Sequence, residues 1–336
     1  MASSLVIQTS FLGDAVLTTP LLAQLARRGP VDIVTTPHSA LLLANHPGLR
    51  RVFSYDKRGA DRGLRGFLSL ARRLRAERYD VAFLAQGSWR SAALALFAGI
   101  PSRIGFTTSS GKWLLTNRVE PQKDQHHAAR LLLLARPHGR EPTAAEVAPS
   151  LYPGVIERTA VDALLTEAGV APHETLVALA PSSLWVTKRW PYYAELAAEL
   201  GSAVRIIVIR SGDDTALAQE ILGTAPRAVD TTGRLSPLAS AELIRRCAVI
   251  VTNDSAPLHL ASAVGTPTVA IFGPTVLSFG FGPLAPGSIV ASNETLTCRP
   301  CARNVPRECP LGHFRCMRDQ SAASIAAHVR SILSSA

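Results

Sequence analysis

The 336-residue sequence contains no run of about 18 uninterrupted apolar residues, the length that a membrane-spanning helix needs. Residues 1–10 carry no positive charge ahead of a long apolar core, and they are typical of a strand, not of a signal peptide. We therefore predict a soluble, cytoplasmic protein that touches a membrane at most from the side.

Aromatic residues make up only 6% of the chain, and basic residues are not interleaved with them. The charge of +10 and the pI near 9.9 come mostly from arginines scattered in small doublets, without a dense basic tail. This pattern does not indicate a nucleic-acid groove. It fits an anionic small substrate or an anionic membrane surface as well as it fits a merely solvated surface.

Two nucleotide-binding signatures are absent as well. Neither predicted domain has G-x-G-x-x-G after its first strand, and G-x-x-x-x-G-K-[ST] does not occur. These absences disfavour a dehydrogenase and a P-loop NTPase.

The chain does contain an alternation of short apolar strands and helical segments, which is typical of doubly wound α/β domains. In the first half, strands are predicted at 5–8, 31–35, 52–55, 81–85 and 103–106, and helices at 15–28, 39–44, 64–77, 91–97 and 125–135. In the second half, strands are predicted at 176–180, 205–209, 228–230, 248–251 and 268–272. Helices are predicted there at 158–168, 192–200, 215–222, 239–247, 256–264 and 322–333.

The pattern weakens between residues 118 and 152, where a proline-rich stretch is the best candidate for a linker. A chain of this length, 47% hydrophobic, can form two domains of ordinary size. We predict a first domain at 1–152, a second at 153–320, and a ligand-binding cleft between them.

The segment 251–275 is the most informative stretch. An apolar strand leads into the polar turn 252–255, and then come a helix of small residues and a second apolar strand. Such a turn lies at the amino end of a helix, where free N–H groups favour anions. Asp254 or Ser255 could cap the helix, and His259 lies one turn further on. If the protein handles a nucleotide or a phosphorylated sugar, this turn is the expected place for it.

Three other loops carry candidate functional side chains. Asp14 follows the first strand, where a carboxylate could take a proton from a hydroxyl nucleophile or could only cap the next helix. Lys188 and Arg189 follow the second domain's first strand and could stabilise a departing pyrophosphate, unless they form a solvated basic turn. Asp214 follows the next strand and could bind ribose hydroxyls or cap a helix.

Four of the five cysteines lie close together near the end of the chain, in the pattern C-x2-C-x7-C-x6-C. Cys298, Cys301, Cys309 and Cys316 could bind zinc or an iron–sulfur cluster, pair as disulfides or stay reduced. A cytoplasmic setting disfavours stable disulfides. The fifth, Cys247, is expected in the core on a helix.

In combination, several separated motifs resemble those of the ADP-heptose:lipopolysaccharide heptosyltransferases, glycosyltransferase family 9. They are F-L-G-D-A-V-L-T-T-P at 11–20, A-G-I-P-S-R-I-G-F at 98–106, K-R-W-P at 188–191, T-N-D-S-A-P-L-H-L-A at 252–261, F-G-P-T at 272–275 and C-P-L-G-H-F-R-C-M at 309–317. The resemblance covers nearly the whole chain. It implies a GT-B fold, with two Rossmann-like domains facing across a cleft and a C-terminal helix, 321–336, that crosses back to the first domain.

The resemblance also implies a reaction. It is an inverting, metal-independent transfer of L-glycero-D-manno-heptose from ADP-heptose to the lipopolysaccharide inner core, without a cofactor. The first domain would hold the acceptor, heptosyl-Kdo-lipid A, and the second the ADP-sugar. The alternative within the family is a heptosyltransferase I that uses Kdo-lipid A, or a transferase for another nucleotide-heptose. We expect peripheral contact with the cytoplasmic face of the inner membrane and no nucleic acid.

Position within these motifs implies a role for individual residues. Asp14 is implied as the general base, and Lys188 as the residue that steadies the diphosphate leaving group. The implied donor-binding residues are Thr187, Lys188, Asp214, Asn253, Asp254, Ser255, Ala256, Pro257 and His259.

The chain departs from the family pattern at two places. Ala256 and Pro257 stand where Gly-Leu is common, and the proline removes one N–H from the helix start. The segment 123–127 lacks the usual H-x-x-x-x-Y pattern, with Arg130 near the expected tyrosine. A distant alternative, suggested by the +10 charge and the cysteine cluster, is a metal-knuckle nucleic-acid-binding protein, but the two-domain α/β layout disfavours it.

Overall fold

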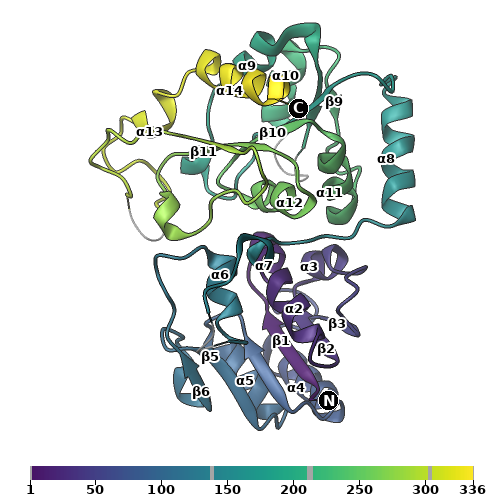
Figure 1. Cartoon of the computed structure of the whole chain (residues 1–336), viewed down its shortest axis with the longest axis vertical. Coiled ribbons are helices and arrows are strands. Elements are labelled where there is room, and N and C mark those ends of the chain that lie inside the picture. The colour runs from purple at the N-terminus through teal and green to yellow at the C-terminus, as the bar shows by residue number, and fades with distance from the viewer. Residues whose placement is uncertain (1, 137–139, 210–214, 302–304, 336) are drawn as a thin grey trace. The chain divides into compact units, whose positions relative to one another are not determined.

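Two parallel sheets organise the chain, one in each of two units, Met1–Tyr152 and Pro153–Ala336 (Figure 1). They are seen in a computed structural model that describes residues 2–136, 140–209, 215–301 and 305–335. Asp214, implied as a donor-binding residue, lies outside the described residues.

The first unit has the strand order β3-β2-β1-β4-β5-β6, and its pairings are parallel. The strands are β1 (Ser4–Gln8), β2 (Val31–Thr35), β3 (Arg51–Ser54), β4 (Val81–Leu84), β5 (Ser102–Phe106) and β6 (Asn117–Val119). The central strand β1 is buried along its whole length, as expected for an uncharged strand with both faces covered. The sequence does not predict β6, because a short, polar edge strand has almost no apolar pattern.

The helices of the first unit differ from the prediction mainly near its start. They are α1 (Leu12–Leu17), α2 (Thr19–Ala26), α3 (Pro37–Leu42), α4 (Gly63–Ala76), α5 (Trp89–Phe97), α6 (His127–Leu132) and α7 (Ala144–Val147), with a 3-10 turn, η1 (Lys112–Leu114). The single helix predicted at 15–28 is wrong, because the chain forms α1 and α2 with a break at Thr18. Pro20 cannot donate a backbone hydrogen bond to the preceding turn, and it is tolerated only in the first turn of a new helix.

The second unit has the order β12-β11-β10-β7-β8-β9, which repeats the order of the first unit when its own strands are numbered from the beginning. The strands are β7 (Leu176–Ala180), β8 (Arg205–Val208), β9 (Val229–Asp230), β10 (Val249–Asn253), β11 (Thr268–Phe272) and β12 (Ile289–Ser292). Strand β10 continues through Asn253, further than predicted, so that the turn before the next helix begins at Asp254. Strand β12, at the sheet edge, is not predicted.

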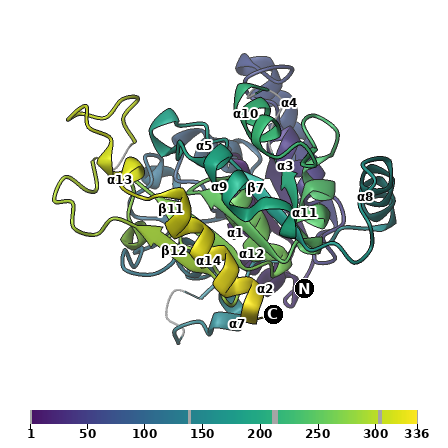
Figure 2. The same ribbon diagram turned by 90° about the horizontal axis from the view of Figure 1, so that it is seen from above.

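The helices of the second unit are α8 (Val155–Glu167), α9 (Tyr193–Leu200), α10 (Thr215–Thr224), α11 (Pro237–Arg246), α12 (Ala256–Val264), α13 (Arg315–Arg318) and α14 (Ala322–Ser335), with 3-10 turns η2 (Val186–Lys188), η3 (Gly201–Ala203) and η4 (Leu277–Phe279). Helix α14 lies beside α9, β10 and β11 (Figure 2). Its Ile325, Val329 and Ile332 are buried in the core of the second unit. The apolar face of the helix is thus covered by its own unit, and the predicted crossing to the first domain stays a prediction.

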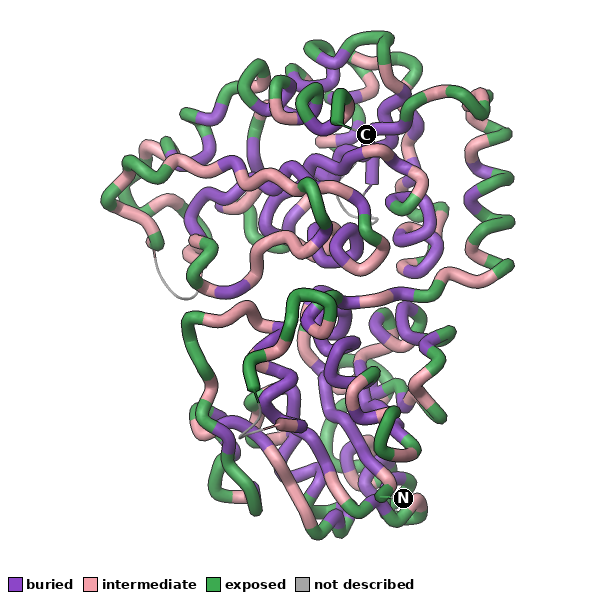
Figure 3. The backbone as a smooth tube through the Cα atoms, in the orientation of Figure 1, coloured by how far each residue is buried: buried purple, intermediate pink, exposed green. Residues whose placement is uncertain are grey.

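Burial follows this layering (Figure 3). The central strands are buried, whereas α8 is largely exposed apart from Val161 and Leu164. Among the described helices, none combines the length and the apolar character that crossing a bilayer requires.

In each sheet, strands are added first on one side of the opening strand and then on the other. The strand order therefore reverses between β1 and β4, and again between β7 and β10. Ligands of open α/β sheets bind outside the carboxyl ends of the strands at such a reversal. The loops that follow these four strands are therefore the expected positions of a site.

Candidate functional site

In the second unit, three side chains from separate loops meet at this reversal of strand order. Lys188 ends η2 in the loop after β7, Asp254 follows β10, and Thr275 follows β11. The three strands are neighbours in the sheet, so their carboxyl ends lie side by side. The topology thus brings together residues that are far apart in the sequence.

The Asp254 carboxylate is the centre of these contacts. Its Oδ2 accepts one hydrogen bond from Lys188 Nζ at 2.5 Å and another from Thr275 Oγ1 at 2.8 Å. Lys188 Nζ also donates to the backbone oxygen of Asp254 at 3.3 Å. The side chains of Lys188 and Asp254 are only 13% and 9% exposed, so solvent ions screen this pair little.

Asn253 and Trp190 join the loop after β7 to the end of β10. The Asn253 side chain accepts the backbone N–H of Trp190 at 3.0 Å and donates to the carbonyl of Pro181 at 2.9 Å. The buried Trp190 ring donates from Nε1 to the carbonyl of Gln320 at 2.8 Å. Asn253 is therefore a positioning residue, since its amide is bonded on both sides within the protein.

The helix after β10 begins with a first turn that no side chain caps. Ser255 occupies the N-cap position with extended backbone, but its side chain makes no capping hydrogen bond. Ala256 and Pro257 are the first residues of α12, and Pro257 brings no N–H. His259 is buried within this turn, 6.2 Å from the ring of Phe281 between centroids. The remaining N–H groups and the helix dipole favour an anion here.

The cysteine-containing segment packs on the same loops. Thr187 Oγ1 donates to the carbonyl of Pro306 at 2.8 Å. The guanidinium of Arg299 donates to the carbonyls of Gly273 and Thr275, the latter at 2.9 Å. Neither Thr275 nor Arg299 is predicted as a site residue. Thr275 does end the F-G-P-T motif, which is the one sequence signal that points to it.

In the first unit, Asp14 is the third residue of α1, in the segment after β1. Its Oδ2 accepts the backbone N–H of Phe11 at 3.2 Å, and its Oδ1 lies 3.8 Å from His127 Nε2. Phe11, not Asp14, is the N-cap residue, and Gly13 lies inside the helix instead of in a turn. Asp14 therefore stabilises the helix start from its third position, while its second oxygen faces a histidine.

His127, the first residue of α6, is a partner that the sequence does not predict. Burial lowers the pKa of its imidazole to about 4, although the Asp14 carboxylate acts in the opposite direction. Arg130 and His126 lower the pKa further. The ring is therefore neutral at physiological pH.

Cations gather at the same edge of the first sheet. Lys57 Nζ donates to the carbonyl of Thr9 at 2.6 Å, and Thr9 Oγ1 donates to Gln86 Oε1 at 2.6 Å. Burial lowers the pKa of Lys57, and the positive charges of Arg58 and Arg90 lower it further. Three cations within electrostatic range of one another suit an anionic ligand.

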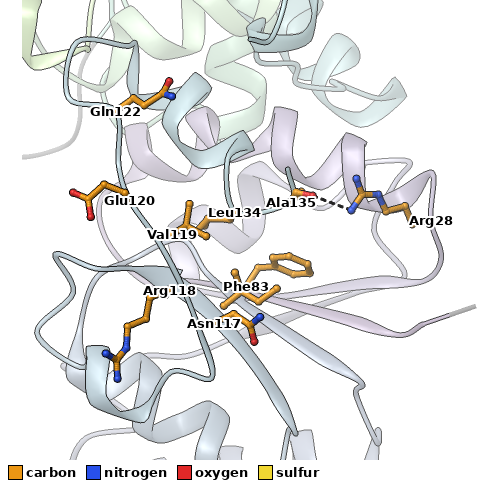
Figure 4. Close-up of a pocket in the computed structure, with 10 residues that line it drawn as sticks. Arg28, Phe83, Asn117, Arg118, Val119, Glu120, Gln122, Leu134 and Ala135 are labelled. Atoms are coloured by element: carbon orange, nitrogen blue, oxygen red, sulfur yellow. Dashed lines mark hydrogen bonds between the residues drawn. The ribbon is translucent and has the colours of Figure 1, made fainter. Parts of the chain in front are cut away.

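A cavity of about 610 Å³ lies elsewhere in the first unit, against the edge strand β6 (Figure 4). Arg118 and Glu120 line it from the edge, and Arg28 on another side donates to the carbonyl of Ala135 at 3.0 Å. None of the predicted site residues lines this cavity, and we do not assign the site to it.

The cysteines are all free thiols. Among the described residues, no three His, Cys, Asp or Glu side chains are placed to hold a metal ion. Cys247 is buried in the core, as predicted, and burial raises its pKa to about 12. Burial acts in the same direction on Cys309, but backbone N–H groups of residues 311–314 donate to its sulfur and lower its pKa.

The two parallel sheets have the architecture of the GT-B fold class of glycosyltransferases. The solved structure of Escherichia coli ADP-heptose lps heptosyltransferase II superposes with a TM-score of 0.80 at 24% identity, covering 100% of this chain and 99% of that chain. The predicted fold class, α/β with two Rossmann-like sheets, is confirmed.

The chain belongs to glycosyltransferase family 9 (heptosyltransferase), whose sequence profile matches residues 67–312. It is 27% identical over 292 residues to lipooligosaccharide heptosyltransferase 2 of Haemophilus influenzae, covering 81% of this chain and 83% of that protein. It is 28% identical over 315 residues to lipopolysaccharide heptosyltransferase 1 of Pseudomonas aeruginosa, covering 89% of this chain and 86% of that protein. The protein is thus a heptosyltransferase of the lipopolysaccharide core.

The low pKa of His127 predicts a pH-dependent stability. The residue protonates near pH 6.5 in an unfolded chain but near 4 here, so the free energy of unfolding falls as the pH drops through this window. Between pH 7.5 and pH 5 the titration of His127 should lower the free energy of unfolding by about 2 kcal/mol. Urea denaturation of the parent and of His127→Gln at both pH values measures this, and the variant should lose about 2 kcal/mol less. Equal losses in both proteins would contradict the assignment.

Proposed function

We propose that this protein transfers L-glycero-D-manno-heptose from ADP-heptose to the heptosyl-Kdo inner core of lipopolysaccharide, with inversion and without a metal. One observation supports the donor site best. The largely buried Lys188 is hydrogen-bonded to Asp254, directly before the first turn of α12, which no side chain caps. The name of the superposed Escherichia coli enzyme includes ADP-heptose. The enzyme would work at the cytoplasmic face of the inner membrane, in peripheral contact with it, and would bind no nucleic acid.

The second unit would bind the donor. An ammonium group has three N–H donors, and two of those of Lys188 face Asp254, which leaves the third for a phosphate oxygen. Negative charge accumulates on ADP as the heptosyl–phosphate bond breaks. Lys188 and the N–H groups at the start of α12 would stabilise that charge in place of a metal ion.

The other implied donor residues would act around this ion pair. Ser255 and Ala256 would offer backbone N–H groups, and Thr187, Pro257 and His259 would shape the pocket. Asn253 would hold the loop through its own hydrogen bonds. Asp214 would accept hydrogen bonds from the ribose hydroxyls.

The first unit would bind the acceptor and provide the base. Asp14 would take the proton of the acceptor hydroxyl as that oxygen attacks the anomeric carbon, and a single displacement inverts the configuration. Neutral His127 would help to orient the free carboxylate oxygen. The cations Lys57, Arg58 and Arg90 would attract the anionic acceptor.

The acceptor can be identified by offering ADP-heptose with either Kdo-lipid A or heptosyl-Kdo-lipid A and weighing the product by mass spectrometry. We expect the mass of one heptose to be added to heptosyl-Kdo-lipid A only. Transfer to Kdo-lipid A alone would favour the alternative, a heptosyltransferase I, for which the similarity to the Pseudomonas aeruginosa enzyme is the supporting observation. Transfer to neither acceptor would contradict the proposal.

Asp14→Asn tests the base. The amide oxygen can still accept the N–H of Phe11, so the helix start should survive while the proton acceptor is lost. We expect the rate of transfer to fall by about 10²- to 10⁴-fold, with the dissociation constant of ADP-heptose nearly unchanged. Asp124→Asn, an exposed change in the same unit, is the matched control for kinetics and calorimetry. A variant that keeps its rate would leave Asp14 as a helix-stabilising residue only.

Lys188→Met tests the leaving-group contact. Loss of the ammonium should weaken the binding of ADP and lower the rate of transfer together, whereas Lys188→Arg should retain part of both. Because Asp254 would be left buried without its partner, thermal unfolding must be recorded beside the binding titration. The exposed Lys123→Met is the control. Unaltered ADP affinity in a folded Lys188→Met variant would remove Lys188 from the site.

A further inference from the structure

Helices α4 and α5 and the turn η1 of the first unit expose large apolar side chains that its core does not use. Leu64 at the start of α4 is 70% exposed, Trp89 at the start of α5 is 63% exposed, and Phe97 at its end is 55% exposed. Trp113 in η1 is 76% exposed. Single exposed apolar residues are ordinary, but two tryptophans on adjoining elements are not.

These residues lie on α4, α5 and η1, of which α5 contacts the other two, and we call their exposed side the α4–α5 surface. Helices α4 and α5 pack side by side on the first sheet (Figure 1). Arg90 of α5 donates to the carbonyl of Gly63, next to Leu64, at 3.4 Å. The rings of Phe67 and Phe97 meet edge to face, with centroids 5.7 Å apart.

The segment before η1 packs closely on the start of α5. The N–H of Trp89 donates to Ser110 Oγ at 3.0 Å. A Cβ on Gly111 would come within 2.6 Å of the Trp89 Cα, so the backbones are in direct contact. The turn η1, which contains Trp113, therefore lies against α5, which begins with Trp89.

The charge of this surface has one sign. Residues 1–152 contain 20 Lys and Arg against 10 Asp and Glu, whereas residues 153–336 contain 15 of each, so the net charge of +10 belongs to the first unit. Between Gly63 and Val119 the only carboxylates are Glu77 and Asp80, against nine basic residues. Glu77 is paired with Arg50 and Arg51, and Asp80 accepts the N–H of Ser3.

We propose that the α4–α5 surface docks on an anionic phospholipid bilayer. Indole rings are amphipathic and settle at the boundary between headgroups and acyl chains, while neighbouring arginines and lysines pair with lipid phosphates. The inference rests on the proposed function in one respect: a lipid A acceptor is anchored in a membrane. Docking would hold the edge that carries Asp14 and Lys57 at the surface where such an acceptor is presented.

The exposed apolar residues at the start of α8 lack this excess of positive charge. In the second unit, Val155 and Ile156 at the start of α8 are 70% and 81% exposed. Helix α8 carries Glu157, Asp162 and Glu167 against one basic residue, Arg158, so its own charge is negative and does not attract an anionic surface. Ile156 therefore provides a matched control.

The test is sedimentation of the full-length protein with vesicles of phosphatidylcholine alone or mixed with phosphatidylglycerol. We expect binding to the anionic vesicles, weakened about 10-fold or more in the double variant Trp89→Ser/Trp113→Ser. The double variant Arg65→Gln/Lys112→Gln should lose about 25-fold, since each basic residue near an anionic surface contributes about fivefold. Ile156→Ser and Arg318→Glu should bind as the parent does.

Two further measurements separate the alternatives. All variants change exposed side chains, so thermal unfolding and transfer to a soluble, deacylated acceptor should stay at parent levels. If the parent protein bound anionic vesicles but transferred no heptose to any acceptor, the proposed function would be contradicted and docking would stand. Docking would be overturned if the parent ignored anionic vesicles, if the variants bound them as the parent does, or if light scattering showed a dimer that the tryptophan variants abolish.

Discussion

The hydrogen-bonded carboxylate of Asp254 is the contact on which the loops of the second unit depend. One oxygen binds the ammonium of Lys188 and the hydroxyl of Thr275, which ties together the ends of three neighbouring strands. A buried ion pair adds little net stability, because desolvation offsets the attraction, but the loss of one partner commonly costs about 3–5 kcal/mol. The pair is therefore better suited to fixing the geometry of the loops than to stabilising the fold. The same geometry leaves one N–H of Lys188 available for a phosphate.

The fold was predictable because its central strands are uncharged apolar runs. The strand predictions at 31–35, 176–180 and 268–272 coincide with β2, β7 and β11. Of the four edge strands, β6 and β12 were not predicted, because they are covered incompletely and their residues show little apolar pattern. The predicted crossing of α14 to the first domain stays a prediction. Its periodicity indicates a buried face, but periodicity does not tell which sheet covers that face.

The candidate site was predictable only loop by loop. Lys188 and Asp254 each follow a strand, but their pairing depends on β7 and β10 being neighbours, which no local pattern states. The same limit hides His127, whose contact with Asp14 depends on where α6 lies against α1. The sequence presents a general base and a helix cap as alternative roles for Asp14, but the structure shows contacts that allow both. One carboxylate oxygen bonds the helix start and the other faces His127, so the two roles do not exclude each other.

The division of charge between the units gives the arginine-rich composition a physical meaning. A net charge of +10 spread evenly would only keep the protein soluble. Confined to the first unit, it creates a field that attracts anions to that unit and leaves the second unit neutral overall. The proposed nucleotide-sugar site would then depend on local donors such as Lys188 and the start of α12, whereas the proposed anionic, membrane-bound acceptor would be attracted over a distance of about 8 Å at physiological salt. The donor would in this way be bound by local hydrogen-bond donors of the second unit, and the acceptor would be attracted by the net positive charge of the first unit.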